Sequence, residues 1–482
     1  MPLVKTWQLI AGSAVAGLAL SVAAVTTAGP WDSGQRKAER DRAASWDRTG
    51  GADHGGGPGS GALPEAAPSA PGVLGVIGPG APRAQSAPAE PASAGGLTAA
   101  LKPLLADPAL GTVRTASVVD TATGQVLYES GARDAMTPAS TVKIVTAAAV
   151  LAALGPEHRI RTTVTPGAAP GQIVLVGGGD PSLTAKKKSP AGSGGSLVAL
   201  AADTAQALKA AGTDTVTLGY DDGLYTGPVR HPIGGNPNIA PVTALTADEG
   251  RPDDSTSGPV ERAEDPSREA ARAFRTLLAD RGVKVTGEPA KAQAAPGVQP
   301  LAVTLSTPIG GLVERMLTNS DNDIAEALAR QTALASGRPA SFEGAEKAVT
   351  DRLTALGIDT VGSRFADGSG LNRADKVSAG LLTGLLTKAA DPARPELRPV
   401  LTGLPVAGFT GTLKARNSGS SPAAGLLRAK TGTLTGVNSL SGTVVDSSGR
   451  LLAFAFLTAN SPGPEGAEKA LDKLAAAVAT AP

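Results

Sequence analysis

Pro138-Ala139-Ser140-Thr141-Val142-Lys143 leads into an apolar run that continues to Leu154 and stops at Gly155-Pro156. A proline just inside the start and a Gly-Pro pair after the last apolar residue are typical of the two ends of a helix. We therefore predict a buried helix on which Ser140 and Lys143, three residues apart, share a face. Burial disfavours the charged form of an amine, and a neutral amine beside a hydroxyl can take its proton. A lone S-x-x-K pattern is also compatible with an ordinary core helix.

Two later segments add groups that fit the same chemistry. Ser320-Asp321-Asn322 lies between two predicted helices, one ending near Leu317 and one covering about 323–335. A hydroxyl in such a loop can pass a proton and an amide can bind a peptide carbonyl, although a helix-capping loop has the same composition. Lys430-Thr431-Gly432-Thr433 ends an apolar strand. Its lysine and hydroxyls suit a carboxylate, and Gly432 would let a ligand backbone lie close, unless the segment is merely a strand edge with a turn glycine.

Composition limits the classes of function. The 482 residues predict more than one domain, and 41% hydrophobic residues suffice for a large core. The 44 basic and 43 acidic residues give a net charge of +1, so the composition does not favour nucleic acid as a partner. Cysteine is absent from the sequence, and the three histidines, His54, His158 and His231, are scattered without metal-ligand spacing. We therefore expect neither thiol chemistry nor a metal site.

The N-terminus predicts export from the cytoplasm. Lys5 precedes an uncharged stretch whose apolar centre runs from Leu9 to Ala28, as in an export signal. At about twenty residues this centre is also long enough to span a bilayer. Residues 1–28 are thus either a signal peptide or a membrane anchor, through which any membrane contact would be made. Residues 29–95 are rich in Gly, Pro, Ala and Ser and lack apolar periodicity, which predicts a disordered linker.

Strand patterns occur at both ends of the remaining chain, with helical patterns between them. Strands are predicted at 116–120, 125–128, 426–433, 439–445 and 451–458, and terminal helices at 97–105 and 465–477. These patterns predict an α+β fold in which one sheet is assembled from both ends. Residues 96–159 and 303–482 would form the domain that carries the motifs. Residues 160–302 would form one compact inserted domain, opening with Val174-Leu175-Val176 and closing with a helix from Ser267 to Leu278.

The order S-x-x-K, S-x-N, K-T-G along one chain is far more specific than any of the three motifs alone. Because its motifs follow this order, the sequence resembles the D-alanyl-D-alanine carboxypeptidase/endopeptidase family, the class C low-molecular-mass penicillin-binding proteins. The resemblance covers about residues 97–480 and includes further strings in matching order: Gly177–Leu183, Asp221–Pro228, Pro241–Leu245, Asp367–Leu371, Leu404–Gly408 and Gly411–Leu413. It implies the penicillin-binding-protein/β-lactamase-like transpeptidase fold, an antiparallel sheet flanked by helices plus an all-helical part, with one inserted domain.

The inserted domain is the departure from the family pattern, because the best-known members carry two domains at this position. It would either shape access for large cell-wall fragments or serve as a passive scaffold. The resemblance further implies a serine-type D-Ala-D-Ala carboxypeptidase, with or without an additional endopeptidase activity. Its partners would be peptidoglycan stem peptides ending in D-Ala-D-Ala, with β-lactams as covalent inhibitors, in the extracytoplasmic cell-wall space.

Roles follow from the resemblance, motif by motif. Ser140 would attack the carbonyl of the penultimate D-Ala, with Lys143 as general base and Ser320 as proton relay. The backbone N–H groups of Ser140 and Thr433 would form the oxyanion hole. The substrate-binding residues would be Asn322, Lys430, Thr431, Gly432 and Thr433, of which Asn322 would hold the substrate backbone and the lysine and threonines the terminal carboxylate.

Two rival functions use the same motifs. A class A β-lactamase also needs a carboxylate and an amide that hold the deacylating water, and the nearest candidate, Arg394-Pro395-Glu396-Leu397-Arg398, has arginines in the places of those two groups. A penicillin-binding-like wall sensor would acylate without turnover or only bind stem peptides. A Ser-His-Asp hydrolase is disfavoured, because the sequence has no G-x-S-x-G.

Overall fold

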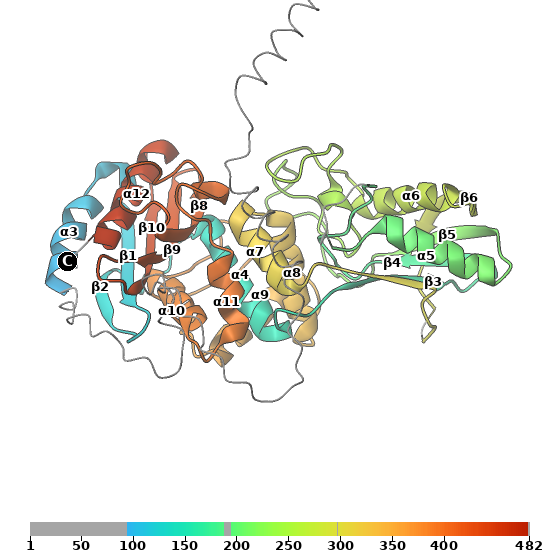
Figure 1. The fold of residues 1–482 in the computed structure, drawn as a ribbon, viewed down its shortest axis with the longest axis horizontal. Coiled ribbons are helices and arrows are strands. Elements are labelled where there is room, and N and C mark those ends of the chain that lie inside the picture. The colour runs from blue at the N-terminus through green and yellow to red at the C-terminus, as the bar shows by residue number, and fades with distance from the viewer. Residues whose placement is uncertain (1–93, 188–193, 296, 481–482) are drawn as a thin grey trace, which may run out of the picture. The chain divides into compact units, whose positions relative to one another are not determined.

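The structure is a computed structural model that describes residues 94–187, 194–295 and 297–480 (Figure 1). The predicted export segment 1–28 and nearly all of the predicted linker lie outside these ranges. The last two linker residues already belong to helix α3, Ala94–Leu105. Across the described ranges, no helix has both the length and the apolar composition needed to cross a membrane.

The first sheet joins the two ends of the described chain. Its strand order is β2-β1-β10-β9-β8 and all its strand pairs are antiparallel. The strands are β1 Val113–Asp120, β2 Val126–Ser130, β8 Leu427–Leu434, β9 Val437–Val445 and β10 Leu451–Ala459. Because β1 pairs directly with β10, the predicted sheet built from both ends is confirmed (Figure 1).

Helices cover both faces of this sheet, as the alternation of β10 requires. Leu452, Phe454 and Phe456 share one apolar cluster with α3 and with the last helix, α12 (Pro464–Thr480). Ala453, Ala455 and Leu457 point the other way, into the cluster of α10, Ala379–Ala390. Small alanines on that face let α10 approach, whereas the two phenylalanines fill the space beneath α12.

A group of helices next to the sheet carries the first two motifs. Its members are α4 Lys143–Leu154, α7 Ile309–Asn319, α8 Asn322–Ala335, α9 Phe342–Ala355 and α11 Arg398–Thr402. Every residue of α4 from Lys143 to Leu151 is buried, since neighbouring helices surround it. A helix that is apolar all round is expected to lie inside a core. The short 3₁₀ segments are Pro108–Leu110, Ala139–Val142, Asp248–Gly250, Pro395–Leu397 and Gly411–Leu413.

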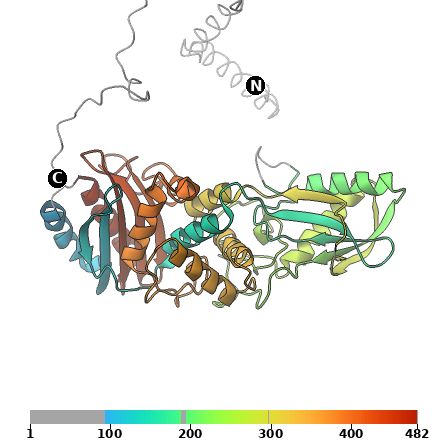
Figure 2. The same ribbon diagram turned by 90° about the horizontal axis from the view of Figure 1, so that it is seen from below.

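The second sheet lies between α4 and α7 in the chain and has the strand order β6-β5-β4-β3-β7. Its strands are β3 Arg161–Pro166, β4 Gln172–Val176, β5 Thr215–Asp221, β6 Lys284–Lys291 and β7 Ala302–Leu305. β4 pairs parallel with β5 and β5 with β6, while β3 runs antiparallel to both of its neighbours. Helices α5 (Leu197–Ala210) and α6 (Pro266–Ala279) pack side by side over the sheet (Figures 1 and 2).

The structure corrects the prediction that the inserted domain ends with a helix. The helix predicted at 267–278 is α6, but it is not the last element, because β6 and β7 follow it. β6 contains a glycine and a proline and is almost wholly exposed, and β7 has only four residues, so neither shows an alternating strand pattern. β7 also extends past the predicted boundary at 302. We call residues 161–305, from the start of β3 to the end of β7, the inserted segment.

Candidate active site

The nucleophile motif is a 3₁₀ turn, Ala139–Val142, that runs directly into α4. In a 3₁₀ turn, side chains three residues apart eclipse one another. Lys143 Nζ accordingly lies 3.1 Å from Ser140 Oγ, and the predicted shared face is confirmed. Ala139 has φ +50°, a left-handed conformation that costs a non-glycine residue free energy and is typical of functional sites.

Lys143 is completely buried and donates to three oxygen atoms. Besides Ser140 Oγ, its Nζ lies 2.7 Å from Asn322 Oδ1 and 2.6 Å from the Ser369 carbonyl oxygen. Burial lowers the pKa of Lys143 to about 8, although nearby carboxylates, Asp367 foremost, oppose this shift. An amine with that pKa has an appreciable neutral fraction near pH 7 and can act as a base.

The second motif connects α7 to α8. Ser320 ends α7 in a left-handed conformation, φ +59° and ψ +41°, and Asp321 caps α8 by accepting the Ile324 N–H at 3.0 Å. Asn322 begins α8 and is placed against Lys143 by this cap. Its Nδ2 donates to the carbonyl of Asn238, in the inserted segment, at 3.0 Å. Since an amide nitrogen carries two hydrogens, one remains for a substrate carbonyl.

The third motif divides over the two faces of β8. Lys430 is fully buried and its Nζ donates to Ser320 Oγ at 2.9 Å and to the Thr431 carbonyl at 2.8 Å. Burial holds the pKa of Lys430 well below its usual value, and the positive charge of Lys143 lowers it further. The structure therefore places the Lys430 amine against Ser320. That Lys430 also binds the substrate carboxylate together with the threonines stays a prediction.

The two threonines lie on the opposite face of β8. Thr431 Oγ1 donates to Thr412 Oγ1 at 2.9 Å, and the exposed Thr433 Oγ1 donates to Glu468 Oε1 of α12 at 3.1 Å. Arg416 Nη1 lies 3.8 Å from Glu468 Oε2, and Arg416 Nη2 lies 2.8 Å from Asp472 Oδ1. Sequence reasoning missed these neighbours. Thr412 lies in the Gly411–Leu413 segment that resembles the family, but nothing in the sequence pairs Glu468 or Arg416 with the K-T-G motif.

Residue 432 must be a glycine for the protein itself to pack. A Cβ atom there would clash with Ser439 Oγ and stand 2.8 Å from the Pro138 carbonyl oxygen. The turn that carries Ser140 can thus lie against β8 only if residue 432 has no side chain. The expectation that Gly432 also lets a ligand backbone lie close stays a prediction.

The predicted oxyanion donors are a strand N–H and a turn N–H. On the outer edge of β8 the Ala429 N–H donates to the Pro405 carbonyl at 3.0 Å. Alternate residues of a strand point their N–H groups the same way, so the N–H of Thr433 also faces outward from the sheet. The turn of Ser140 packs beside Gly432, and the oxyanion hole formed by the two N–H groups stays a prediction.

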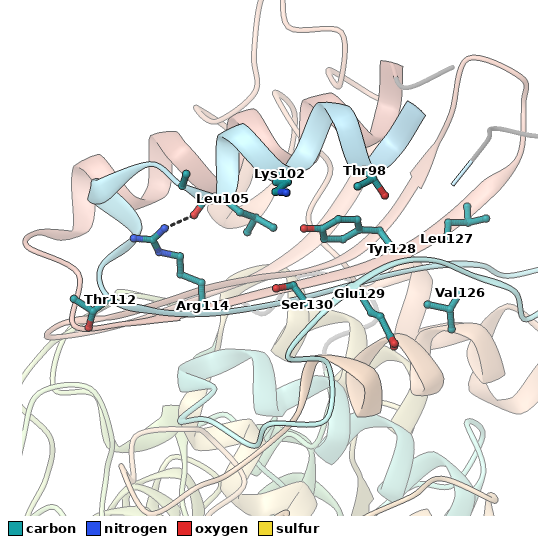
Figure 3. A pocket seen from close by; sticks show the side chains of 11 residues that line it. Thr98, Lys102, Leu105, Thr112, Arg114, Val126, Leu127, Tyr128, Glu129 and Ser130 are labelled. Atoms are coloured by element: carbon teal, nitrogen blue, oxygen red, sulfur yellow. Dashed lines mark hydrogen bonds between the residues drawn. The ribbon is translucent and has the colours of Figure 1, made fainter. Parts of the chain in front are cut away.

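Two other features do not belong to this cluster. A hollow of about 900 Å³ lies between α3 and β2, at the opposite edge of the sheet from β8, and Lys102, Arg114 and Tyr128 are among its lining residues (Figure 3). Within the described ranges, two groups of potential metal ligands come within 4.8 Å of one another: His231, Glu326 and Asp367, and Glu249, Asp321 and Asp323. Carboxylates of both groups already accept hydrogen bonds from other protein groups. In the first group the donors are His231 and a backbone N–H, and in the second they are arginines.

The fold and the site together define a serine acyl-transferase of the penicillin-binding type. An antiparallel sheet with helices on both faces carries Ser140 and the buried Lys143 beside one edge strand. A second Ser-Lys pair, Ser320 and Lys430, joins the neighbouring loop to that strand. The family described as D-Ala-D-Ala carboxypeptidase 3 (S13) matches residues 97–258 and 250–479. The chain belongs to this family of serine peptidases, and the predicted family, enzyme class and fold class are confirmed.

Individual relatives agree with this assignment. The chain is 39% identical over 393 residues to carboxypeptidase DacB of Mycolicibacterium smegmatis, covering 79% of this chain and 83% of the relative. It is 29% identical over 451 residues to the D-alanyl-D-alanine carboxypeptidase of Actinomadura sp. strain R39, covering 75% and 80%. The crystal structure of penicillin binding protein 4 from Haemophilus influenzae superposes with a TM-score of 0.63 at 23% identity, covering 79% of this chain and 97% of that one, which shows a shared fold.

Proposed function

We propose that this chain is a serine-type D-Ala-D-Ala carboxypeptidase that trims peptidoglycan stem peptides through an acyl-enzyme on Ser140. The observation that carries the proposal is the buried Lys143 amine, with its lowered pKa, 3.1 Å from the Ser140 hydroxyl. Membership of a carboxypeptidase family supports the same reaction. β-Lactams would acylate the same hydroxyl.

The first half of the reaction forms the acyl-enzyme. Ser140 Oγ attacks the carbonyl carbon of the penultimate D-Ala while the neutral Lys143 amine takes the hydroxyl proton. The backbone N–H groups of Ser140 and Thr433 stabilise the oxyanion. As the peptide C–N bond breaks, Ser320, which accepts a hydrogen bond from Lys430 at 2.9 Å, relays the proton taken up by Lys143 to the leaving nitrogen, and D-Ala departs as the free amine. Water then attacks the ester, and Ser140 is regenerated.

The other groups hold the substrate in register. Thr431 and Thr433 lie on one face of β8 and offer two hydroxyls to the terminal carboxylate of the peptide. Their present partners, Thr412 and Glu468, would be exchanged for the carboxylate oxygens. Lys430 supports this end from the opposite face, and the second N–H of Asn322 Nδ2 binds a backbone carbonyl of the stem.

Neither rival function gains support from the contacts. Glu396, the nearest candidate for a lactamase carboxylate, pairs with Arg394 at 3.5 Å and is exposed to about a third on its side chain. It therefore stands in an ordinary surface ion pair. A wall sensor without turnover would need a defect in the proton-transfer groups, yet Lys143 and Ser320 are both within hydrogen-bonding distance of a partner in the cluster.

The location of the enzyme is part of the proposal. The apolar segment at 1–28 supports export, with the folded body in the extracytoplasmic cell-wall space, and residues 29–95 would act as a tether if that segment is retained. The membrane would then be contacted only through residues 1–28. No cofactor is needed for the reaction.

The test uses the purified full chain, a fluorescent penicillin and a peptide ending in D-Ala-D-Ala. The proposal predicts one covalent label per chain. It also predicts that free D-Ala accumulates with time beyond one molecule per chain. Label without D-Ala release would support the sensor instead. Rapid loss of the label with hydrolysed penicillin as product would support a β-lactamase.

A further inference from the structure

His231 belongs to the inserted segment but is buried among residues of the helices and of the loop before α10. Its side chain is 1% exposed. The ring Nε2 lies 2.9 Å from Asp367 Oδ2 and 3.7 Å from Glu326 Oε1, and the ring meets Phe342 of α9 edge-on at 5.3 Å. The other ring nitrogen, Nδ1, accepts the Ile233 N–H at 3.3 Å. His231 is thus held from both sides in one orientation.

The two carboxylates beside His231 organise one loop, residues 367–372. Asp367 Oδ1 accepts the N–H groups of Ser369 and Gly370 at 3.1 and 2.6 Å. Glu326 Oε1 accepts the N–H groups of Gly368 and Ser369, both at 3.0 Å. Four hydrogen bonds from one short stretch of backbone fix the direction of the carbonyl groups between them.

That loop reaches the catalytic cluster directly. The Ser369 carbonyl accepts from Lys143 Nζ at 2.6 Å, and the Gly368 carbonyl accepts from Thr146 Oγ1 at 2.7 Å. A Cβ atom on Gly370, whose φ is +83°, would clash with the Ala139 carbonyl, so the loop rests on the turn of Ser140. The position of the Lys143 amine therefore depends on the loop, and the loop depends on Asp367 and Glu326.

We propose that His231 is a positioning residue for acyl transfer. Its Nε2–H fixes Asp367, and through the 367–372 loop it holds the Lys143 amine against Ser140. The inference rests on the proposed function. It also gives the inserted segment a part in the chemistry, in place of a passive scaffold, since residues 161–305 supply both His231 and the Asn238 carbonyl that holds Asn322.

The positioning does not depend on whether the imidazole is charged. Burial lowers the pKa of His231, but the hydrogen bonds to Asp367 and Glu326 outweigh it and raise the pKa to about 9. The Ile233 N–H that points at Nδ1 instead favours the neutral ring with its proton on Nε2. In both states Nε2 carries a hydrogen and donates it to Asp367.

Four variants of the full chain separate positioning from folding. His231→Phe keeps the ring but loses the donor, His231→Asn is too short to reach Asp367, and His231→Gln restores a donor at about the place of Nε2. His158→Gln, at an exposed histidine, is the matched control. Each is measured for the rate constant of acylation by fluorescent penicillin at saturation, for the non-covalent dissociation constant, and for kcat and KM on a D-Ala-D-Ala peptide.

We expect His231→Phe and His231→Asn to lower the acylation rate constant and kcat by about ten- to a hundredfold, because a small displacement of a catalytic group has effects of that size. KM and the dissociation constant should stay within about twofold, and His231→Gln should recover most of the rate. If His231→Phe does not fold, the Asn and Gln pair decides. Unchanged rates in His231→Asn, or equal losses in the Asn and Gln variants, would overturn the inference. An unmodified chain that is neither labelled nor active would instead overturn the proposed function.

Discussion

The two ends of the candidate site are built in different ways. At the inner end, Lys143 and Lys430 are fully buried, and each amine donates to oxygen atoms within the cluster. At the outer end, Thr433 and Glu468 are accessible to solvent, and Arg416 balances two carboxylates there. β8 separates the two ends, with alternate residues facing each.

This difference assigns different work to the two ends. Desolvation lowers the pKa of a buried amine and prepares it for proton transfer, which is what the inner end requires. Solvent screens charges at the outer end, so we expect the hydroxyls and ion pairs there to affect substrate preference more than the chemical step. Substitutions at the inner end should therefore change rate constants by orders of magnitude, and those at the outer end should change the preference between substrates by smaller factors.

Ser140→Ala should have the largest effect. Removing the nucleophile should abolish penicillin labelling and D-Ala release, because the Ser140 hydroxyl is the one that lies 3.1 Å from the Lys143 amine. Gel fluorescence and a D-Ala assay measure the two losses. Ser447→Ala, in the exposed hairpin between β9 and β10, is the control and should behave as the unmodified chain. Labelling that survives in Ser140→Ala would place the nucleophile elsewhere.

Lys143→Ala should come next. Loss of a general base typically costs about 10²- to 10⁴-fold in rate. The fold should survive, since the change removes a buried amine whose desolvation opposes folding. Stopped-flow acylation and thermal melting check the two parts. An acylation rate equal to that of the unmodified chain would show that another group is the base.

Thr431→Val tests the outer end. On the unmodified enzyme, a substrate ending in D-Ala amide loses a charge-assisted hydrogen bond worth about 1.5–3 kcal/mol, or about ten- to a hundredfold in kcat/KM. Thr431→Val should cost the acid substrate much more than the amide, whose partner for the hydroxyl is already missing. The four kcat/KM values form a double-mutant-style cycle. Thr435→Val, exposed just beyond the strand, serves as the control. Equal cleavage of acid and amide by the unmodified enzyme would exclude carboxylate recognition by this strand.

Glu468→Gln should have the smallest effect. The amide oxygen can still accept from Thr433, but a negative charge near the expected carboxylate disappears. For a partly exposed charge we expect a KM for the acid substrate about two- to threefold lower, with the amide substrate unaffected. Glu465→Gln, in the same helix and paired with Lys469, is the matched control. A higher KM for the acid would mean that Glu468 supports the site rather than repelling the substrate.

The sequence predicted the inner end much better than the outer one. Ser140 and Lys143 are three residues apart, so local helical geometry alone brings them together, and the strand patterns of β8, β9 and β10 are strong enough to predict the sheet. Ser369 contributes only its backbone carbonyl, and because every residue has one, the sequence cannot predict this contact. Glu468 and Arg416 come near Thr433 through the packing of α12 on the sheet, and such contacts depend on the tertiary fold. In the inserted segment, β6 and β7 could not be predicted because their sequences lack an alternating strand pattern.

The central claim is that a buried, neutral Lys143 amine activates Ser140, and the pH dependence of acylation tests it most directly. Burial lowers the pKa of Lys143 to about 8, and only the neutral form accepts a proton. Below that value each unit of pH should raise the neutral fraction about tenfold. The rate constant for acylation by penicillin should therefore rise as the pH increases toward about 8 and level off above it. A rate constant that stays flat from about pH 6 to 9, or that falls as the pH rises through this range, would contradict the account.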